Sequence, residues 1–344
     1  MKEKLFFFSL KHPLLYILTL AMVLRLLLAV FSDSLYVGTD HYFNIYRIPD
    51  EWFTSRWVSF ITQFILGAFS LIIIILAYRI TKIIADKTTA LEIAVFMAFL
   101  WIFPVLSISL RASVVSIPFL LYGTLLIIKQ DNLLNNNEKE KFHRTTFIVA
   151  GFFLGLGFAV YFHSLIYYIG ILATLFILKN WKGALMTLTG YVIAVGLTQT
   201  FIDLLIYHRP FVSLTSFFSS LTLWNDNWIV LPIAILLALI PPMSVMLIFG
   251  FFRVWRKYIL LFLPTFVSLI GFIFLYDTKL SFDEFNNIIL MVLPTYIIAG
   301  YVGWKEFYKN SAFWSGKKWL IRSCYIVFAV LNTVVFIDLF VEIL

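Results

Sequence analysis

Long apolar runs separated by short charged segments constrain this chain more than any other feature. A helix that crosses a membrane needs about 20 mostly apolar residues, and runs close to that length recur along the whole sequence. Eleven runs can be recognised, at residues 14–31, 57–77, 90–105, 113–128, 147–161, 165–178, 184–202, 229–250, 259–276, 288–304 and 319–340. The pattern predicts an all-α, polytopic membrane protein with about eleven transmembrane helices.

The composition supports the same class. The 344 residues are 62% hydrophobic and 13% charged, whereas a soluble domain carries about 25% charged residues. No segment rich in Pro, Gly or Ser divides the chain, so we expect a single domain over residues 1–344. The first run is too long for the apolar core of a cleaved signal peptide, and we expect it to remain as the first helix.

The charges sort onto two sides of these runs. If the N-terminus is cytoplasmic, 20 of the 26 Lys and Arg residues fall in inner segments, and the outer segments hold five, at Arg47, Arg56, Arg111, Arg209 and Lys279. An excess of Lys and Arg marks cytoplasmic loops, so this orientation is predicted, in a plasma (inner) membrane. The net charge of +8 is then explained by cytoplasmic loops that meet anionic headgroups, and it does not indicate a nucleic-acid partner.

The outer segments carry the groups that could do chemistry. The first of them, residues 32–56, contains Thr39-Asp40-His41-Tyr42-Phe43-Asn44. A carboxylate such as Asp40 could take a proton from an acceptor hydroxyl. The alternative is a solvated loop acid or a helix N-cap.

A second group of candidates is cationic. Convergent cations suit a lipid phosphate, because charge builds on that leaving group as a sugar departs. The alternative is that these side chains reach out to headgroups. Asp283 and Glu284, in the outer segment 277–287, could be metal ligands, bind an acceptor or remain solvated. No strong metal motif or cofactor motif is recognisable. The cationic candidates are Arg111, His163, His208, Arg209 and Lys279.

Three patches give the chain a family resemblance. Arg25 followed by Asp40-His41-Tyr42-Phe43-Asn44 resembles an Asp-Glu-x-Phe-Asn pattern, with His41 in place of Glu. The stretch Leu110-Arg111-Ala112-Ser113 and the segment from Asp203 through Tyr207 to Arg209 and Phe217 are the other two. Together they resemble the GT-C membrane glycosyltransferases, most of all glycosyltransferase family 22, the lipid-linked mannosyltransferases.

The resemblance implies a function. It implies an inverting transferase that moves a mannose-like hexose from a polyprenyl phosphate to a glycan or glycolipid on the non-cytoplasmic face, without a metal or cofactor. Asp40 would be the general base, and Arg111, Arg209 and Lys279 would bind the donor phosphate. The remaining contacts to acceptor or donor would come from His41, His163, His208, Asp283 and Glu284.

Two other classes of function remain open from the sequence. One is a non-catalytic subunit of a membrane complex that keeps a GT-C-like fold, and the other is a glycan polymerase or flippase-type protein. Replacement of Asp40 by Asn distinguishes them, because an enzyme should lose turnover while a scaffold should keep its partners.

Overall fold

Every regular element in the described part of the chain is a helix. The computed structural model describes residues 12–31, 55–107, 109, 111–135, 144–220, 243–255, 257–274, 282–310 and 318–343. The all-α prediction is therefore confirmed. The helices are α2 (Pro13–Phe31), α5 (Arg56–Ile84), α6 (Lys87–Phe99), α7 (Ile102–Ser107), α8 (Ala112–Asn135), α9 (Arg144–Val160), α10 (Ser164–Ile177), α11 (Trp181–Tyr207), α12 (Val212–Ser220), α14 (Met243–Arg253), α15 (Ile259–Phe274), α16 (Phe282–Asn310) and α18 (Lys318–Ile343).

Four described stretches are long and apolar enough to cross a membrane: Pro13–Phe31, Arg56–Ile84, Ala112–Gln130 and Trp181–Tyr207. Five shorter apolar helices accompany them. Large apolar side chains such as Leu197, Phe201 and Leu205 are more than 60% exposed on α11, which is the surface expected where lipid, not water, covers a helix. A described helix overlaps each of the eleven predicted ranges, and the crossing of all eleven stays a prediction.

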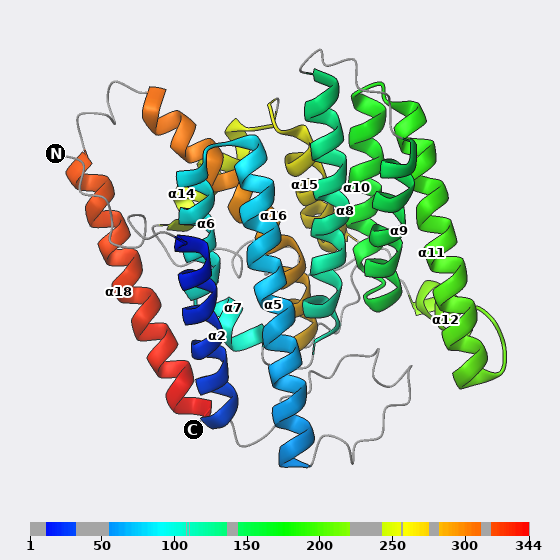
Figure 1. The fold of residues 1–344 in the computed structure, drawn as a ribbon, viewed down its shortest axis with the longest axis horizontal. Helices are drawn as coiled ribbons and strands as arrows, with labels where there is room; N and C mark the ends of the chain where they lie inside the picture. The colour runs from blue at the N-terminus through cyan, green and yellow to red at the C-terminus, as the bar shows by residue number, and fades with distance from the viewer. Residues whose placement is uncertain are drawn as a thin grey trace.

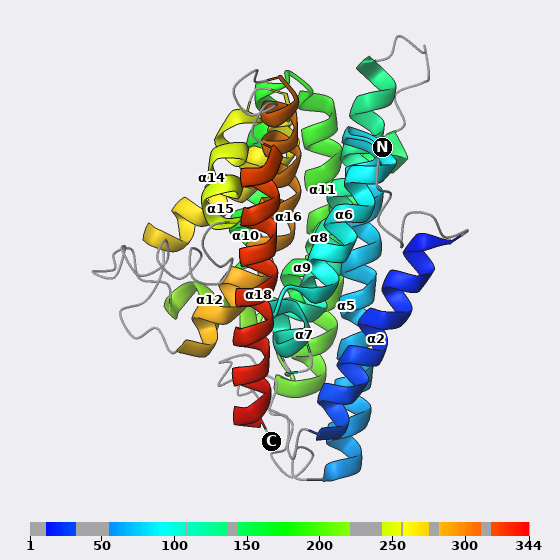
Figure 2. The same cartoon turned by 90° about the vertical axis from the view of Figure 1, so that its left-hand side faces the viewer.

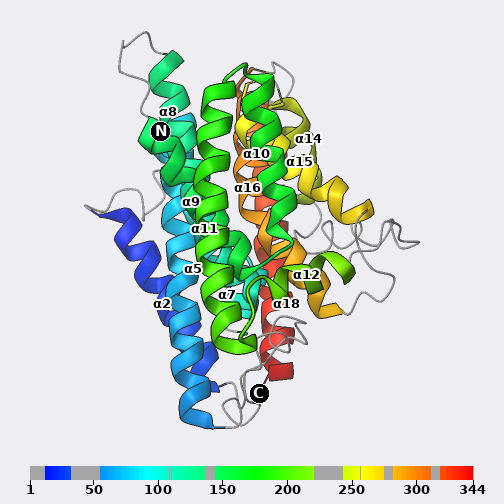
Figure 3. The same cartoon turned by 90° about the vertical axis from the view of Figure 1, so that its right-hand side faces the viewer.

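Successive long helices run in opposite directions, so their connections gather at two ends of the bundle (Figure 1). We call one the Asp86 end, where α5 turns into α6, α10 into α11 and α14 into α15. The other is the Arg111 end, where α2 and α12 end and α5 and α8 begin. Figure 2 shows the bundle from the side that carries α18 and α2, and Figure 3 shows it from the side that carries α11.

Close backbone contacts hold neighbouring helices together. A Cβ added at Gly190 of α11 would lie 1.9 Å from the carbonyl oxygen of Ile148 in α9, and one added at Gly250 of α14 would lie 1.9 Å from the carbonyl oxygen of Gly300 in α16. Small residues at such crossings let helices approach closely in a membrane, where no hydrophobic effect draws helices together.

The predicted helix over residues 90–105 is broken into two. Helix α6 ends at Phe99 and α7 begins at Ile102. The break is closed by Asn332 of α18, whose amide oxygen accepts the backbone N–H of Trp101 at 2.9 Å and whose amide nitrogen donates to the carbonyl oxygen of Phe99 at 2.9 Å. These bonds satisfy backbone groups that would otherwise be left unpaired inside the bundle, so α18 is an integral part of this region.

Candidate functional site

Arg111 is buried at the start of α8. The residue is 2% exposed, its Nε donates to the hydroxyl of Ser109 at 3.2 Å, and its carbonyl oxygen accepts the N–H of Val114 at 3.2 Å. The first backbone N–H groups of a helix carry a partial positive charge, which adds to the charge of the guanidinium. A buried cation at this position makes the Arg111 end attractive to an anion.

Arg25 is a second buried cation, in the middle of α2. It is also 2% exposed. Its Nε donates to the hydroxyl of Ser70 at 2.5 Å, and its Nη1 donates to the carbonyl oxygens of Ala21 at 2.9 Å and Ala98 at 3.4 Å. No described residue accepts a hydrogen bond from its Nη2. Among the described residues no carboxylate balances this charge, so Arg25 adds positive potential between α2, α5 and α6.

A cleft of about 440 Å³ lies between the Arg111 ends of α2 and α5. Ala29, Val30 and Phe60 form an apolar wall, and Arg56, Ser59 and Gln63 supply polar groups. Such a volume lies within the range of about 300–1,000 Å³ typical of small-molecule sites. Because residues 32–54 join α2 to α5, the segment that contains Asp40 connects to both sides of this cleft.

Asp203 is a buried carboxylate at the Arg111 end of α11, and its environment could not be predicted from the sequence. The predicted run 184–202 was too short at its end, because α11 continues to Tyr207 and α12 follows. The Oδ2 atom of Asp203 accepts the backbone N–H of Ser213 at 3.0 Å and lies 2.8 Å from the Ser213 hydroxyl, which is also 2.6 Å from the amide oxygen of Gln199. Asp203 thus caps the start of α12 from another helix.

This cap positions the turn that carries His208 and Arg209. His208 (φ 56°) and Phe211 (φ 60°) adopt the left-handed backbone conformation, which is uncommon for residues other than glycine. Both His208 and Arg209 are exposed. The bonds between Asp203 and Ser213 hold the chain on both sides of this reversal, so they fix where Arg209 stands.

The described members of the predicted cation set share one end of the bundle but differ in burial. Arg111 is buried, Arg209 is exposed, and His163 is half-buried in the turn between α9 and α10, with its ring centroid 5.2 Å from that of Tyr161. Helix α9 packs against both α8 and α11, so it stands between the helices that carry Arg111 and Arg209 (Figure 1). A single phosphate bound by these cations stays a prediction.

The other predicted site residues fall largely beyond the described part. Asp40, His41 and Lys279 lie outside the described residues. Asp283 and Glu284 were expected in a loop over residues 277–287, but α16 begins at Phe282, so their backbone belongs to its first turn. Their side chains lie outside the described part.

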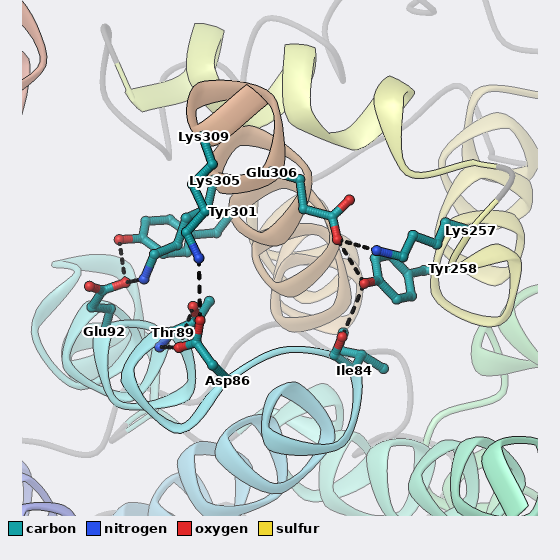
Figure 4. Close-up of polar contacts among 10 residues, drawn as sticks. All are labelled: Ile84, Asp86, Thr89, Glu92, Lys257, Tyr258, Tyr301, Lys305, Glu306 and Lys309. Carbon is teal, nitrogen blue, oxygen red and sulfur yellow. Dashed lines mark hydrogen bonds and ion pairs between the residues drawn. The ribbon is translucent and has the colours of Figure 1, made fainter. Parts of the chain in front are cut away.

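The Asp86 end carries polar contacts that the sequence did not reveal (Figure 4). The ammonium group of Lys305 pairs with the carboxylate of Glu92, which also accepts the Tyr301 hydroxyl at 3.1 Å. Lys309 lies 3.5 Å from Asp86. These contacts join the last turns of α16 to α6, so several lysines that the sequence indicated as determinants of topology also hold the bundle.

The Asp86 carboxylate is tuned by its surroundings. Partial burial raises its pKa, but the backbone N–H and hydroxyl of Thr89, at 2.7 and 2.9 Å, and the charges of Lys305 and Lys309 lower it, and the net pKa is below the ordinary value. The carboxylate therefore stays ionised and caps α6.

A second group at this end surrounds Glu306. Lys257 donates to its carboxylate at 2.5 Å, and the hydroxyl of Tyr258 lies 2.9 Å from the same oxygen and 3.0 Å from the carbonyl oxygen of Ile84 (Figure 4). The bond to Glu306 raises the pKa of Lys257. The group ties the turn between α14 and α15 to α16 and to the end of α5.

The described part of the chain is thus all-helical, with several helices able to cross a membrane and with two buried arginines, Arg25 and Arg111. Among its described residues no cluster of His, Cys, Asp or Glu side chains could hold a metal ion. No protein-family model matches the sequence, and no curated protein is significantly similar to it.

Proposed function

We propose that the protein is a membrane glycosyltransferase that moves a hexose from a polyprenyl phosphate to a hydroxyl of a glycan or glycolipid. The observation that carries the proposal is the burial of Arg111, at 2% exposure, at the end of the bundle to which the Asp40 segment connects. Buried cations inside membrane proteins commonly mark functional sites, and a lipid-linked phosphate is an anion that a membrane can deliver.

In the proposed reaction Asp40 acts as the general base. It accepts the proton of the acceptor hydroxyl while that oxygen attacks the anomeric carbon of the donor sugar. The bond from the anomeric carbon to the phosphate oxygen breaks, and the polyprenyl phosphate leaves with the bonding electrons. Arg111 stabilises the negative charge that builds on the departing phosphate. Attack from the face opposite the leaving group inverts the anomeric centre.

The other predicted residues take supporting roles. Arg209 is exposed beside the Asp203 cap, so it fits a ligand that arrives at the rim of the bundle better than one that lies beside Arg111. Lys279 remains a candidate for the phosphate. The candidates for contacts to acceptor or donor remain His41, His163, His208, Asp283 and Glu284.

The proposal is tested by transfer of a labelled hexose from its polyprenyl phosphate to extracted cell-envelope glycolipids, with the purified protein in lipid nanodiscs. Asp40→Asn should remove most turnover. Arg111→Gln should weaken donor use about tenfold or more, since a charge-assisted contact is worth about 1.5–3 kcal/mol. Arg79→Gln, an exposed arginine of α5 near the Asp86 end, is the matched control. Full activity of Asp40→Asn would refute Asp40 as the general base. No transfer by the native protein would refute the enzyme, and unchanged partners in Asp40→Asn would then favour a scaffold.

Orientation is part of the proposal, because the acceptor must meet the Arg111 end outside the cytoplasm. In intact cells of a strain that carries the chain with Cys324 replaced by Ser, a cysteine introduced at position 40 should react with a membrane-impermeant maleimide. A cysteine introduced at Lys179, in the turn between α10 and α11, should react after the membrane is opened. The reverse pattern would overturn both orientation and site.

A further inference from the structure

We infer that the cleft between α2 and α5 binds the phosphate of a membrane lipid, with Arg56 as its cationic ligand. The identity of that lipid as the polyprenyl-phosphate donor rests on the proposed function, whereas the binding of a lipid phosphate does not. The inference names a place of entry for the donor that differs from the predicted set of Arg111, Arg209 and Lys279.

The cleft has a polar side and an apolar side. Ser59 and Gln63 stand four residues apart on α5, which places them on one face of the helix, and both are buried, at 4% and 2% exposure. Ala29 and Val30 of α2 and Phe60 of α5 supply the apolar side. A headgroup with hydrogen-bonding atoms can therefore face the polar side while a chain covers the apolar side, as in most small-molecule sites.

The charge around the cleft favours an anion. Helices α2 and α5 contain no Asp or Glu. Arg56 is exposed in the cleft lining and makes no ion pair with a described residue. Arg25 lies deeper between the same helices, where its Nε donates a hydrogen bond to the hydroxyl of Ser70.

The neighbouring helices do not cancel this charge. Helices α6, α7, α8 and α16 pack on α2 or α5, and the described acidic side chains among them are Glu92 and Glu306. Both pair with lysines at the Asp86 end, on the far side of the bundle from the cleft. A phosphate is the anion that a guanidinium binds well, because two of its N–H groups can reach two phosphate oxygens.

The exposed surface beside the cleft indicates that the phosphate belongs to a lipid. Trp57, at the cleft, is 78% exposed, and the nearby Val30, Phe31 and Ile61 are 47–54% exposed. Tryptophan is enriched at the membrane interface, at the level of the headgroups. A lipid whose phosphate lies at Arg56 could lay its chain along these apolar side chains, whereas free phosphate would leave them unused.

The test is native mass spectrometry of the purified full-length protein with a polyprenyl phosphate, phosphatidylglycerol or inorganic phosphate added. We expect the polyprenyl phosphate to be retained, Arg56→Gln to reduce its retention about tenfold or more, and Arg56→Lys to restore part of it. Ala29→Leu, which fills the apolar wall, should also reduce retention. Arg79→Gln, on the same helix but far from the cleft, should bind as the native protein does.

The outcomes separate the possible occupants. Equal retention by the native protein and by both Arg56→Gln and Ala29→Leu would overturn the inference, and so would binding of inorganic phosphate as tightly as the lipid. Stronger retention of phosphatidylglycerol than of the polyprenyl phosphate would overturn the donor as the occupant. Binding that depends on Arg56 without any hexose transfer would refute the proposed function and leave the lipid site standing. Hexose transfer that Arg56→Gln leaves unchanged would refute entry of the donor through this cleft and leave the proposed function standing.

Discussion

Replacing Gly190 by alanine tests whether α9 and α11 depend on direct backbone contact. The added Cβ would lie 1.9 Å from the carbonyl oxygen of Ile148 and 2.8 Å from the backbone nitrogen of Phe152. Because both atoms belong to the backbone of α9, rotation of a side chain cannot relieve the overlap. The two helices must move apart, and the contacts between them loosen along their length.

The expected magnitude follows from two opposing effects. Overpacking of this kind costs about 1–3 kcal/mol, while alanine favours a helix over glycine by about 0.5–1 kcal/mol. For Gly190→Ala the overlap dominates, and the free energy of unfolding should fall. Gly196→Ala in the same helix is the matched control, since a Cβ there meets nothing within 4 Å, and its stability should stay unchanged or rise.

Thermal unfolding of the purified protein in detergent, followed by its intrinsic fluorescence, measures the difference. Gly190→Ala should melt below the native protein and Gly196→Ala at or above it. If the two variants melted together, close contact between α9 and α11 would not stabilise the bundle, and the reasoning would be refuted.

Three further predictions concern other contacts. Asn332→Leu should lower the melting temperature, because two part-buried backbone groups at the break between α6 and α7 lose hydrogen bonds worth about 1 kcal/mol each. A melt equal to that of the native protein would show that other groups satisfy the break. Asp86→Asn should destabilise the protein near neutral pH. In melts across a pH series, the difference from the native protein should shrink as the pH falls below the ordinary Asp pKa of about 3.9 and through the depressed pKa of Asp86. The reason is that the stabilisation by an ionised carboxylate is lost there. A double-mutant cycle of Glu92→Gln and Lys305→Met, read by melting, should show coupling, and strict additivity would mean that their contact contributes nothing.

Several elements of the fold could be predicted from local pattern. Runs of apolar residues locate the helices, because a helix buried in lipid must be apolar over most of its length. The charge pattern likewise predicts which connections share an end, and Lys179, Lys257 and Lys309 do lie at the Asp86 end. The break after Phe99 could not be predicted, because the side chain that satisfies it, Asn332, is distant in the sequence.

In the candidate site, too, some features could be predicted from the sequence and others depend on packing between distant segments. The sequence indicated which residues could carry charge at the Arg111 end, but not which of them are buried. Arg111 and Arg209 look alike as outer arginines, yet one is buried beside Ser109 and the other is exposed after a left-handed turn. Burial depends on which face of each helix meets its neighbours, and that is decided by packing between distant segments.

By itself, the amino-acid sequence determined the helical class, the approximate helix positions and the supply of cations at one end, because each depends on local composition and on transfer of side chains between water and lipid. Tertiary structure alone decided that Arg25 is held by Ser70, that Asp203 caps α12 and that a cleft opens beside Arg56. Each of these depends on two segments brought together by helix packing, and no local pattern in either segment encodes the other.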